Sequence, residues 1–216
     1  MLFANDDEII QYLKGIVSLN NGGIVIENID RLKTHGIDTL VENSVLNPSG
    51  QIRGLSRFII KSAALEMGIV LSSIQGLYDA RGRGECSGFT VPAINIRGMS
   101  YDFSRSIFRT AQKLNTGSFI FEIAKSEIGY TFQQPHEIVG VIIGAAIREN
   151  HTGPVFIQGD HFQVSAKNYQ TSKDKELSGL KKLIQKGIEA GFYNIDIDTS
   201  TLVDLSKPTV VEQQRA

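Results

Sequence analysis

The stretch Gly153-Pro-Val-Phe-Ile-Gln-Gly-Asp-His-Phe162 decides how the rest of this sequence is interpreted. Residues 154–158 form a short apolar run between turn-forming residues, which is typical of a buried β-strand. Asp160 and His161 follow directly, at the C-terminal tip of that strand. Because neighbouring side chains of a regular strand face opposite ways, we expect a bend at Gly159 to bring both groups to one mouth.

A carboxylate at such a mouth can move a proton, and a neutral imidazole can hold a divalent metal. The plainer alternative is a strand-to-helix turn that carries a solvated Asp160 and a hydrogen-bonded His161. The surrounding sequence favours the functional interpretation, because further polar residues follow the other strands that it predicts.

The pattern of a short apolar strand followed by an amphipathic helix repeats from residue 89 onward. Expected strands cover residues 89–96, 118–124, 154–158 and 193–198, and expected helices cover residues 101–114, 135–149, 175–190 and 207–214. Strands that alternate with helices, without hairpins between them, form a parallel sheet with right-handed crossovers. Two α/β architectures satisfy this pattern, a TIM (β/α)₈ barrel and an open doubly wound sheet, and both collect function at the C-terminal strand ends.

Polar residues follow each of the four predicted strands. They are Asn95, then Lys125, Ser126 and Glu127, then Asp160 and His161, and finally Asp196 and Asp198. Because the carboxyl ends of parallel strands meet on one side of a sheet, we expect these side chains to surround a single site.

Residues 1–86 differ from the remainder and form the first of two predicted units, a mainly helical segment without a chemistry-bearing cluster. Helical spacing of apolar residues predicts helices over residues 5–19, 30–41, 55–67 and 72–80. Residues 24–26 fit either a strand or the start of a helix. Residues 81–85 are rich in arginine and glycine, but no strand precedes them and no helix follows, so we interpret them as a solvated loop and not as a phosphate cradle.

The second unit, residues 87–216, contains four strand–helix repeats, which is half of an eight-unit barrel. The chain ends within a predicted helix, and the last strand would leave a sheet edge uncovered. We therefore expect the chain to be the N-terminal portion of a longer polypeptide, inactive alone and prone to associate.

The composition excludes several classes of function. The chain has 216 residues, of which 41% are hydrophobic and 21% are charged, enough for a substantial globular core. A net charge of −1 gives no support for a nucleic-acid or membrane surface. The sequence contains no apolar run of membrane-spanning length and no signal peptide at its acidic N-terminus. A single cysteine, Cys86, excludes an internal disulfide and fits a reducing cytoplasm.

With these motifs in order, residues 89–200 resemble the class II, metal-dependent fructose-bisphosphate aldolases and the related tagatose-bisphosphate aldolases. The matching stretches are Val91-Pro-Ala-Ile-Asn95, Lys125-Ser-Glu-Ile-Gly129, Pro154-Val-Phe-Ile-Gln-Gly-Asp-His161 and Ile195-Asp-Ile-Asp-Thr-Ser200. The resemblance implies a TIM barrel, with about the first four βα units present here. It also implies a zinc-dependent lyase of carbohydrate metabolism, of the glycolytic type. Such an enzyme cleaves a ketose bisphosphate reversibly into dihydroxyacetone phosphate and an aldehyde.

The resemblance implies roles for five residues. Asp160 corresponds to the proton-transfer carboxylate of the family, and His161 corresponds to its first ligand for zinc, or for another divalent cation. Asn95 and Ser126 correspond to positions that contact the sugar-phosphate substrate, and Asp198 corresponds to the acidic residue beside the metal. Members of the family stabilise the enediolate that forms on cleavage with the cation, which acts as a Lewis acid.

The sequence departs from the family on both sides of the Asp-His pair, with Gln158 and Gly159 before it and Phe162 after it. Together with the long helical segment, these departures predict a divergent branch. Two other functions stay open: a non-catalytic TIM-barrel subunit that stabilises a partner aldolase, and a metal-dependent sugar-phosphate isomerase. For a full-length enzyme we expect a homo-oligomer.

Three further histidines are candidates for metal ligands only by residue type. His136 begins a predicted helix after a strand end, where a structural role at the helix start is the better interpretation. His35 and His151 are interpreted as surface residues.

Overall fold

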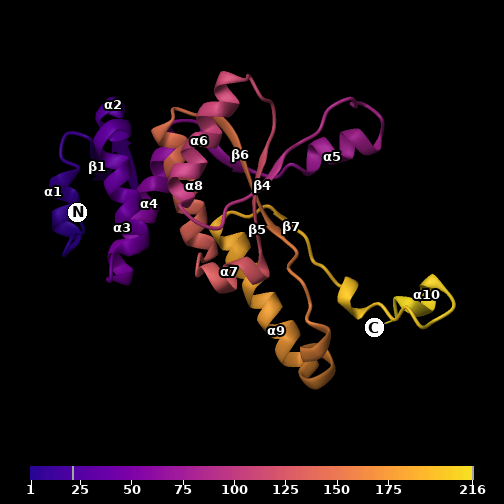
Figure 1. Ribbon diagram of the computed structural model, residues 1–216. Helices are drawn as coiled ribbons and strands as arrows, with labels where there is room; N and C mark the ends of the chain where they lie inside the picture. Colours follow the sequence, from indigo (N-terminus) through magenta and orange to yellow (C-terminus); the bar gives the residue numbers. More distant parts are fainter. Residues whose placement is uncertain (21, 216) are drawn as a thin grey trace.

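A parallel β-sheet forms the centre of the computed structural model, which describes residues 1–20 and 22–215. Its strands are β3 (Ile69–Ser72), β4 (Ala93–Asn95), β5 (Ile120–Ala124), β6 (Gly153–Asp160) and β7 (Asn194–Ile195). Every pairing described within this sheet is parallel. The predicted α/β class with a parallel sheet is therefore confirmed (Figure 1).

Strand β6 is hydrogen-bonded along both of its edges. On one side β5 pairs with residues 156–160. On the other side β3 pairs with residues 153–156 and β7 pairs with residues 158–159. Strands β4, β5, β6 and β7 are thus neighbours in the order in which they occur along the chain.

Three of the four predicted strands, those other than β6, are shorter in the structure than in the sequence analysis. Residues 89–92 lie outside β4; Pro92 has no N–H to donate, although its carbonyl accepts from Ile120 N at 2.8 Å. Residues 196–198 leave β7 to pair with the loop after β6, where Phe162 N donates to Asp196 O at 2.9 Å.

Two strands were not predicted. The helix expected over residues 5–19 is wrong in its second half, because α1 covers only Asp6–Tyr12 and Val17–Asn20 form strand β1. Strand β3 also lies within the segment interpreted as helical, and four residues are too few to display a strand or helix period. The segment 24–26, left open between strand and helix, belongs to β2 (Gly23–Ile26), which pairs antiparallel with β1 (Val17–Asn20).

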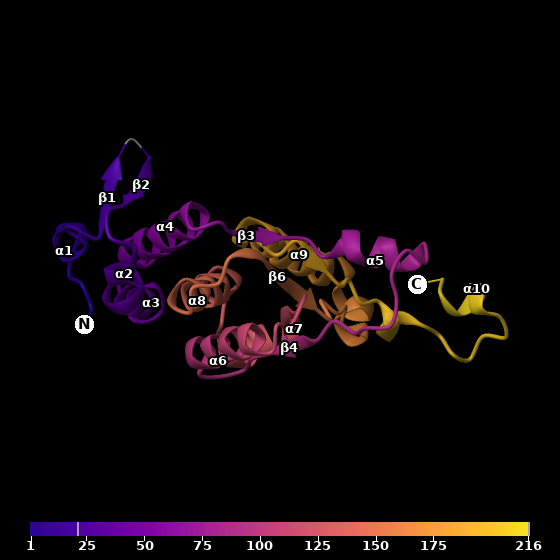
Figure 2. The ribbon, with the colours of Figure 1, turned by 90° about the horizontal axis from the view of Figure 1, so that it is seen from above.

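The remainder of residues 1–86 is mainly helical, as predicted. The helices are α1 (Asp6–Tyr12), α2 (Ile29–Arg31), the π-helical η1 (Leu32–Gly36), α3 (Ile37–Leu46), α4 (Gly50–Glu66) and α5 (Gln75–Gly82). Their apolar side chains share one continuous buried cluster with the sheet and its helices. Helices α1 to α4 and the C-terminal segment lie at opposite ends of the molecule (Figure 1, Figure 2).

The helices that follow the strands are α6 (Ser100–Lys113), α7 (Lys125–Thr131), α8 (Pro135–Arg148) and α9 (Ala166–Ala190), followed by the short helices η2 (Ser200–Leu202) and α10 (Val210–Gln213). Three of them, α6, α8 and α9, agree with the predicted repeat, whereas α7 was not predicted and the expected helix over residues 207–214 is only the short α10. Helix α9 starts earlier than predicted because a first segment joins it across a kink at Ser172. No helix among the described residues is both long and apolar enough to cross a bilayer.

Helix α8 is the most enclosed helix, with 11 buried residues. It contacts α3 and α4 of the N-terminal segment as well as α6 and α9, and it lies between α3, α4 and α6 in Figure 2. The closest approach is at Gly144, where an added Cβ would lie 2.3 Å from Val41 Cγ2 of α3. The absence of a side chain at Gly144 therefore lets the N-terminal segment dock on α8.

We expect Gly144→Ala to lower the free energy of unfolding by about 1–3 kcal/mol, because the added methyl group overlaps Val41. Gly140→Ala on the same helix is the matched control, since its nearest neighbour, Arg57 Cγ, lies at an ordinary 3.6 Å. The control should be neutral or stabilising by up to about 1 kcal/mol through helix propensity. Urea unfolding of both variants measures the difference, and equal effects would contradict the docking role of Gly144.

Candidate metal centre

One face of the sheet carries a row of polar side chains. Asn95 on β4 is in register with Glu122 on β5, Glu122 with Gln158 on β6, and Gln158 with Asn194 on β7. Residues in register on parallel strands share a face, so the three amides and the one carboxylate lie side by side. Gln158 Nε2 donates to Glu122 Oε2 at 2.8 Å, which joins the two central members.

Asp160 is the next residue of β6 on this polar face. Its register partner on β5 is Ala124, which leaves the space beside the carboxylate open on that side. The alternating residues Val155, Ile157 and Gly159 are buried on the opposite face. The sheet thus has an apolar side packed in the core and a polar side that leads to the C-terminal strand ends.

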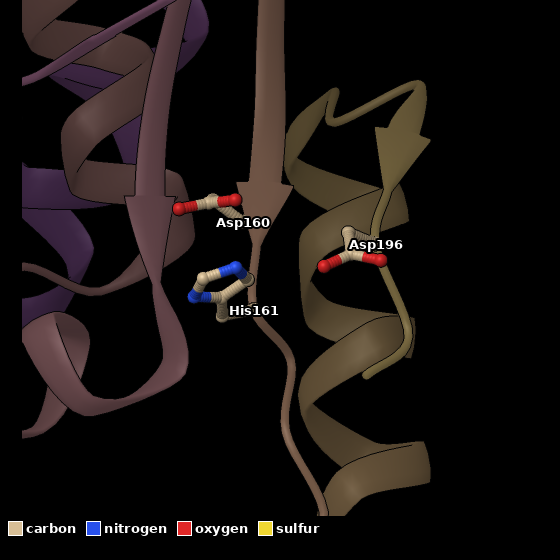
Figure 3. Close-up of side chains that lie close together, drawn as sticks. All are labelled: Asp160, His161 and Asp196. Atoms are coloured by element: carbon tan, nitrogen blue, oxygen red, sulfur yellow. The ribbon is translucent and has the colours of Figure 1, made fainter. Parts of the chain in front are cut away.

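Asp160, His161 and Asp196 form a cluster at those ends. A carboxylate oxygen of each aspartate and a ring nitrogen of His161 all lie within 4.8 Å of one another. Figure 3 shows the imidazole beside the Asp160 carboxylate at the tip of β6, while Asp196 projects toward the pair from the end of β7. Asp160 is half-buried, and the other two are exposed.

The backbone turn that unites the Asp160 and His161 side chains lies at His161 and not at Gly159, which corrects the prediction. Gly159 remains within the sheet, paired with Ile123 and Ile195. His161 has a φ of 44°, in the left-handed region that non-glycine residues rarely adopt. This turn breaks the strand alternation directly after Asp160, so both side chains reach the same mouth.

Gly159 has a different role, which is to make room for Phe162. A Cβ at position 159 would lie 2.7 Å from two ring carbons of Phe162, whose side chain is fully buried against the strand. The two departures from the aldolase pattern, a small residue at 159 and a large one at 162, are therefore complementary in volume.

Backbone hydrogen bonds hold Asp196 in place. Its N–H donates to Gly159 O at 2.8 Å, and its carbonyl accepts from Phe162 N at 2.9 Å. Asp196 is thus fastened to the residues on both sides of the Asp160–His161 pair. Sequence analysis placed Asp196 at a strand end but assigned the acidic position beside the metal to Asp198.

The donor set fits a divalent cation. One imidazole and two carboxylates are ligand types that zinc accepts, with bonds of about 2.1 Å and therefore ligand–ligand separations of about 3.5 Å. The three groups lie within 4.8 Å already, so small side-chain rotations would bring them to that separation. Two of these groups would hold the cation and leave positions for substrate oxygens, while the third carboxylate stays beside them.

The other predicted site residues lie around this cluster without joining it. Asp198 accepts from Ser200 N at 2.8 Å and from Gln163 Nε2 at 2.6 Å, so it shapes the loops beside His161. Hydrogen bonds from Ser200 hold the pKa of Asp198 below its ordinary value. Ser126 is exposed on the first turn of α7.

Sequence analysis assigned no role to Glu122, which lies at the centre of the polar row. Burial, followed by the charge of the nearby Asp160, raises the pKa of the Glu122 carboxyl. The sequence feature that could have identified Glu122 is a charged residue in the middle of an otherwise apolar predicted strand.

The other three histidines lie outside the cluster. His136 stands at the start of α8, where burial and the neighbouring Lys61 and Arg57 lower its pKa. His35 is exposed, as predicted. His151 is half-buried and not a plain surface residue, since its ring lies 4.9 Å from that of Phe108.

Glu176 on α9 holds the loop after His161. Its carboxylate accepts from Lys125 Nζ at 2.8 Å and from Ser165 N at 3.0 Å. Lys125 also donates to Gln163 O at 2.8 Å. The hydrogen bonds from Lys125 and Ser165 lower the pKa of Glu176 to about 2. Helices α7 and α9 are thus connected across the loop beside the cluster.

Comparisons with family models, with curated proteins and with solved structures find no match to this chain.

We expect Gly159→Ala to lower the free energy of unfolding by about 1–3 kcal/mol, because the added methyl group collides with the Phe162 ring. Chemical denaturation measures the change. The double variant Gly159→Ala, Phe162→Leu tests the cause, since a smaller side chain at 162 should recover part of the loss. A double variant that is less stable than the sum of the single effects would refute the volume argument.

We expect Glu176→Gln to lower stability in a pH-dependent way. A glutamate whose folded pKa is lowered stabilises the fold fully above its ordinary pKa of 4.5, and this contribution is lost as the pH falls toward the folded value of about 2. The difference in unfolding free energy from the wild type should be constant between about pH 6 and 7 and vanish toward pH 2. The exposed Glu66→Gln is the control. A difference that persists at low pH would contradict the ion pair.

Proposed function

We propose that this protein is a metal-dependent aldehyde-lyase of the class II aldolase type, which cleaves a ketose phosphate reversibly into dihydroxyacetone phosphate and an aldehyde. The observation that carries the proposal is the cluster of Asp160, His161 and Asp196 at the C-terminal ends of β6 and β7. Parallel α/β folds assemble their active sites at such ends. The resemblance of four motifs, each at a strand end, supports the same reaction.

We further propose that the sheet belongs to a TIM-type barrel. The support is the order of strands β4 to β7, which neighbour one another in chain order as barrel strands do. Strand β3 departs from that order, because it pairs with β6 and not with β4. The polar row fits the inner side of such a barrel, and the apolar face fits the side covered by helices.

The residues divide the chemistry between them. His161 and Asp196 would hold the cation, which supplies a Lewis acid for the negative charge of an enediolate. Asp160 accepts the proton of the hydroxyl on the carbon that becomes the aldehyde, and it returns this proton in the reverse reaction. Asn95 and Ser126 contact the sugar phosphate from the ends of β4 and β5. Asp198 keeps Gln163 and the neighbouring loop in place.

A second candidate is a non-catalytic aldolase subunit. The observation that favours it is the single imidazole of the cluster, because zinc sites in enzymes often contain two or three histidines. Metal analysis separates it from the lyase, and product analysis separates the lyase from a sugar-phosphate isomerase.

In the full-length protein, we expect Asp160→Ala to lower the rate of carbon–carbon cleavage by about 10²–10⁴-fold while the protein retains most of its metal, because the carboxylate moves a proton. His161→Ala should lose the metal together with the activity, because it removes the imidazole donor. Fructose and tagatose 1,6-bisphosphate serve as probes in a coupled aldehyde assay, and metal content is measured by mass spectrometry.

His35→Ala, which removes an exposed imidazole far from the cluster, is the matched control and should retain metal and activity. Activity that survives Asp160→Ala would refute the assignment of the proton-transfer group. A metal-free wild type that cleaves neither probe would favour the non-catalytic subunit.

A further inference from the structure

Glu127 is a buried carboxylate that the proposed reaction does not use. It occupies the third position of α7, and its side chain is only 7% exposed. Oε2 accepts from Ala124 N and from Asn95 Nδ2, both at 2.9 Å, and Oε1 accepts from Arg97 Nε. The bond to Ala124 is the return half of a capping box, which positions the carboxylate between β4 and β5.

These contacts keep Glu127 ionised. Burial alone would raise its pKa, but the hydrogen bonds from Ala124, Asn95 and Arg97 outweigh burial and lower the pKa. An ionised carboxylate is an acceptor only. The Asn95 amide must therefore turn its NH₂ group, and not its carbonyl oxygen, toward Glu127. The hydrogen-bond partners alone decide this orientation, because the two ends of an amide have nearly the same shape.

This orientation directs the carbonyl oxygen of Asn95 away from Glu127. Among the residues that the structure describes, no donor hydrogen-bonds to Asn95 Oδ1. Asn95 belongs to the polar row, in register with Glu122 and one row before Asp160. An acceptor at this place selects a ligand that can donate, which a hydroxyl group can do and an ionised phosphate oxygen cannot.

We infer that Glu127 is a positioning residue that locks the Asn95 amide, so that Asn95 Oδ1 accepts a hydrogen bond from a hydroxyl of a polyhydroxylated substrate. The inference rests on the proposed function and deepens it. It assigns Asn95 to the sugar hydroxyls of the substrate and not to its phosphate. The locking itself is a property of the free protein and can be tested without turnover.

The variant Glu127→Met removes both acceptor oxygens with little change of volume. Asn95 Nδ2 then has no carboxylate to donate to, so the Asn95 amide is free to rotate and the substrate no longer meets a fixed acceptor. Cleavage of fructose 1,6-bisphosphate should fall about 10- to 100-fold in kcat/KM, the effect of one lost hydrogen bond.

A second substitution distinguishes orientation from a general structural role. In Glu127→Gln the carbonyl oxygen can take the place of Oε2 and accept from both Ala124 N and Asn95 Nδ2, while the NH₂ group faces Arg97. We expect Glu127→Gln to lose the ion pair with Arg97 but to retain the Asn95 orientation and most of kcat/KM. Equal losses of kcat/KM in Glu127→Gln and Glu127→Met would overturn the positioning role.

NMR of the free protein measures the orientation of the Asn95 amide without any enzyme activity. The side-chain NH₂ resonances of Asn95 are assigned in an amide NMR spectrum by their loss in Asn95→Asp. They should have hydrogen-bonded shifts in the wild type and in Glu127→Gln, and move to those of a free amide in Glu127→Met. Glu149→Met is the matched control, because Glu149 is a similarly enclosed carboxylate that binds Arg105 and Arg109 after α8.

Asn95 resonances that are unchanged by Glu127→Met would refute the lock, whether or not the wild type cleaves a sugar. A wild type without cleavage whose Asn95 resonances respond as expected would reject the proposed function and retain the positioning role. The two failures are therefore distinguishable.

Discussion

The backbone pairing of β6 on both edges is the constraint on which the rest of the structure depends. Strand β5 occupies one edge, while β3 and β7 share the other, at the start and the end of β6. Because both edges are occupied, the register of β6 is fixed, and a shift by one residue would exchange its polar and apolar faces. Asp160 can point to the open side only because Val155 and Ile157 are held in the core.

The cluster also depends on local features that oppose ordinary preferences. His161 adopts a left-handed backbone that costs a non-glycine residue on the order of 1–3 kcal/mol. The burial of Phe162 directly after it, over the space left at Gly159, offsets this cost. The strain at His161 thus accompanies the geometry that brings the imidazole to the carboxylates, and packing beneath the site maintains it.

The sequence predicted the repeating parallel architecture well, because long amphipathic helices such as α6 and α8 and the apolar run of β6 display clear periods. It did not reveal β3, whose four residues are too short for a period and whose partners are distant in the chain. It located Asp160 and His161 but misplaced the turn, since a glycine signals backbone freedom equally when its role is to leave room for a ring. The pairing of Asp196 with Gly159 depends on tertiary contacts that no local pattern contains.

The electrostatics of the polar face connect the cluster to the function that we propose. Asp160, Asp196 and Glu122 bring three carboxylates to one region, and the raised pKa of Glu122 records the cost of burial and of that proximity. Glu127 is also buried, but its pKa is not raised, because Arg97, the Asn95 side chain and the Ala124 N–H donate hydrogen bonds to its carboxylate. Among the described residues, no lysine or arginine forms a salt bridge with Asp160 or Asp196, so a divalent cation would relieve the repulsion between the two carboxylates. The fold thus compensates one carboxylate internally and leaves the other pair free to bind a ligand.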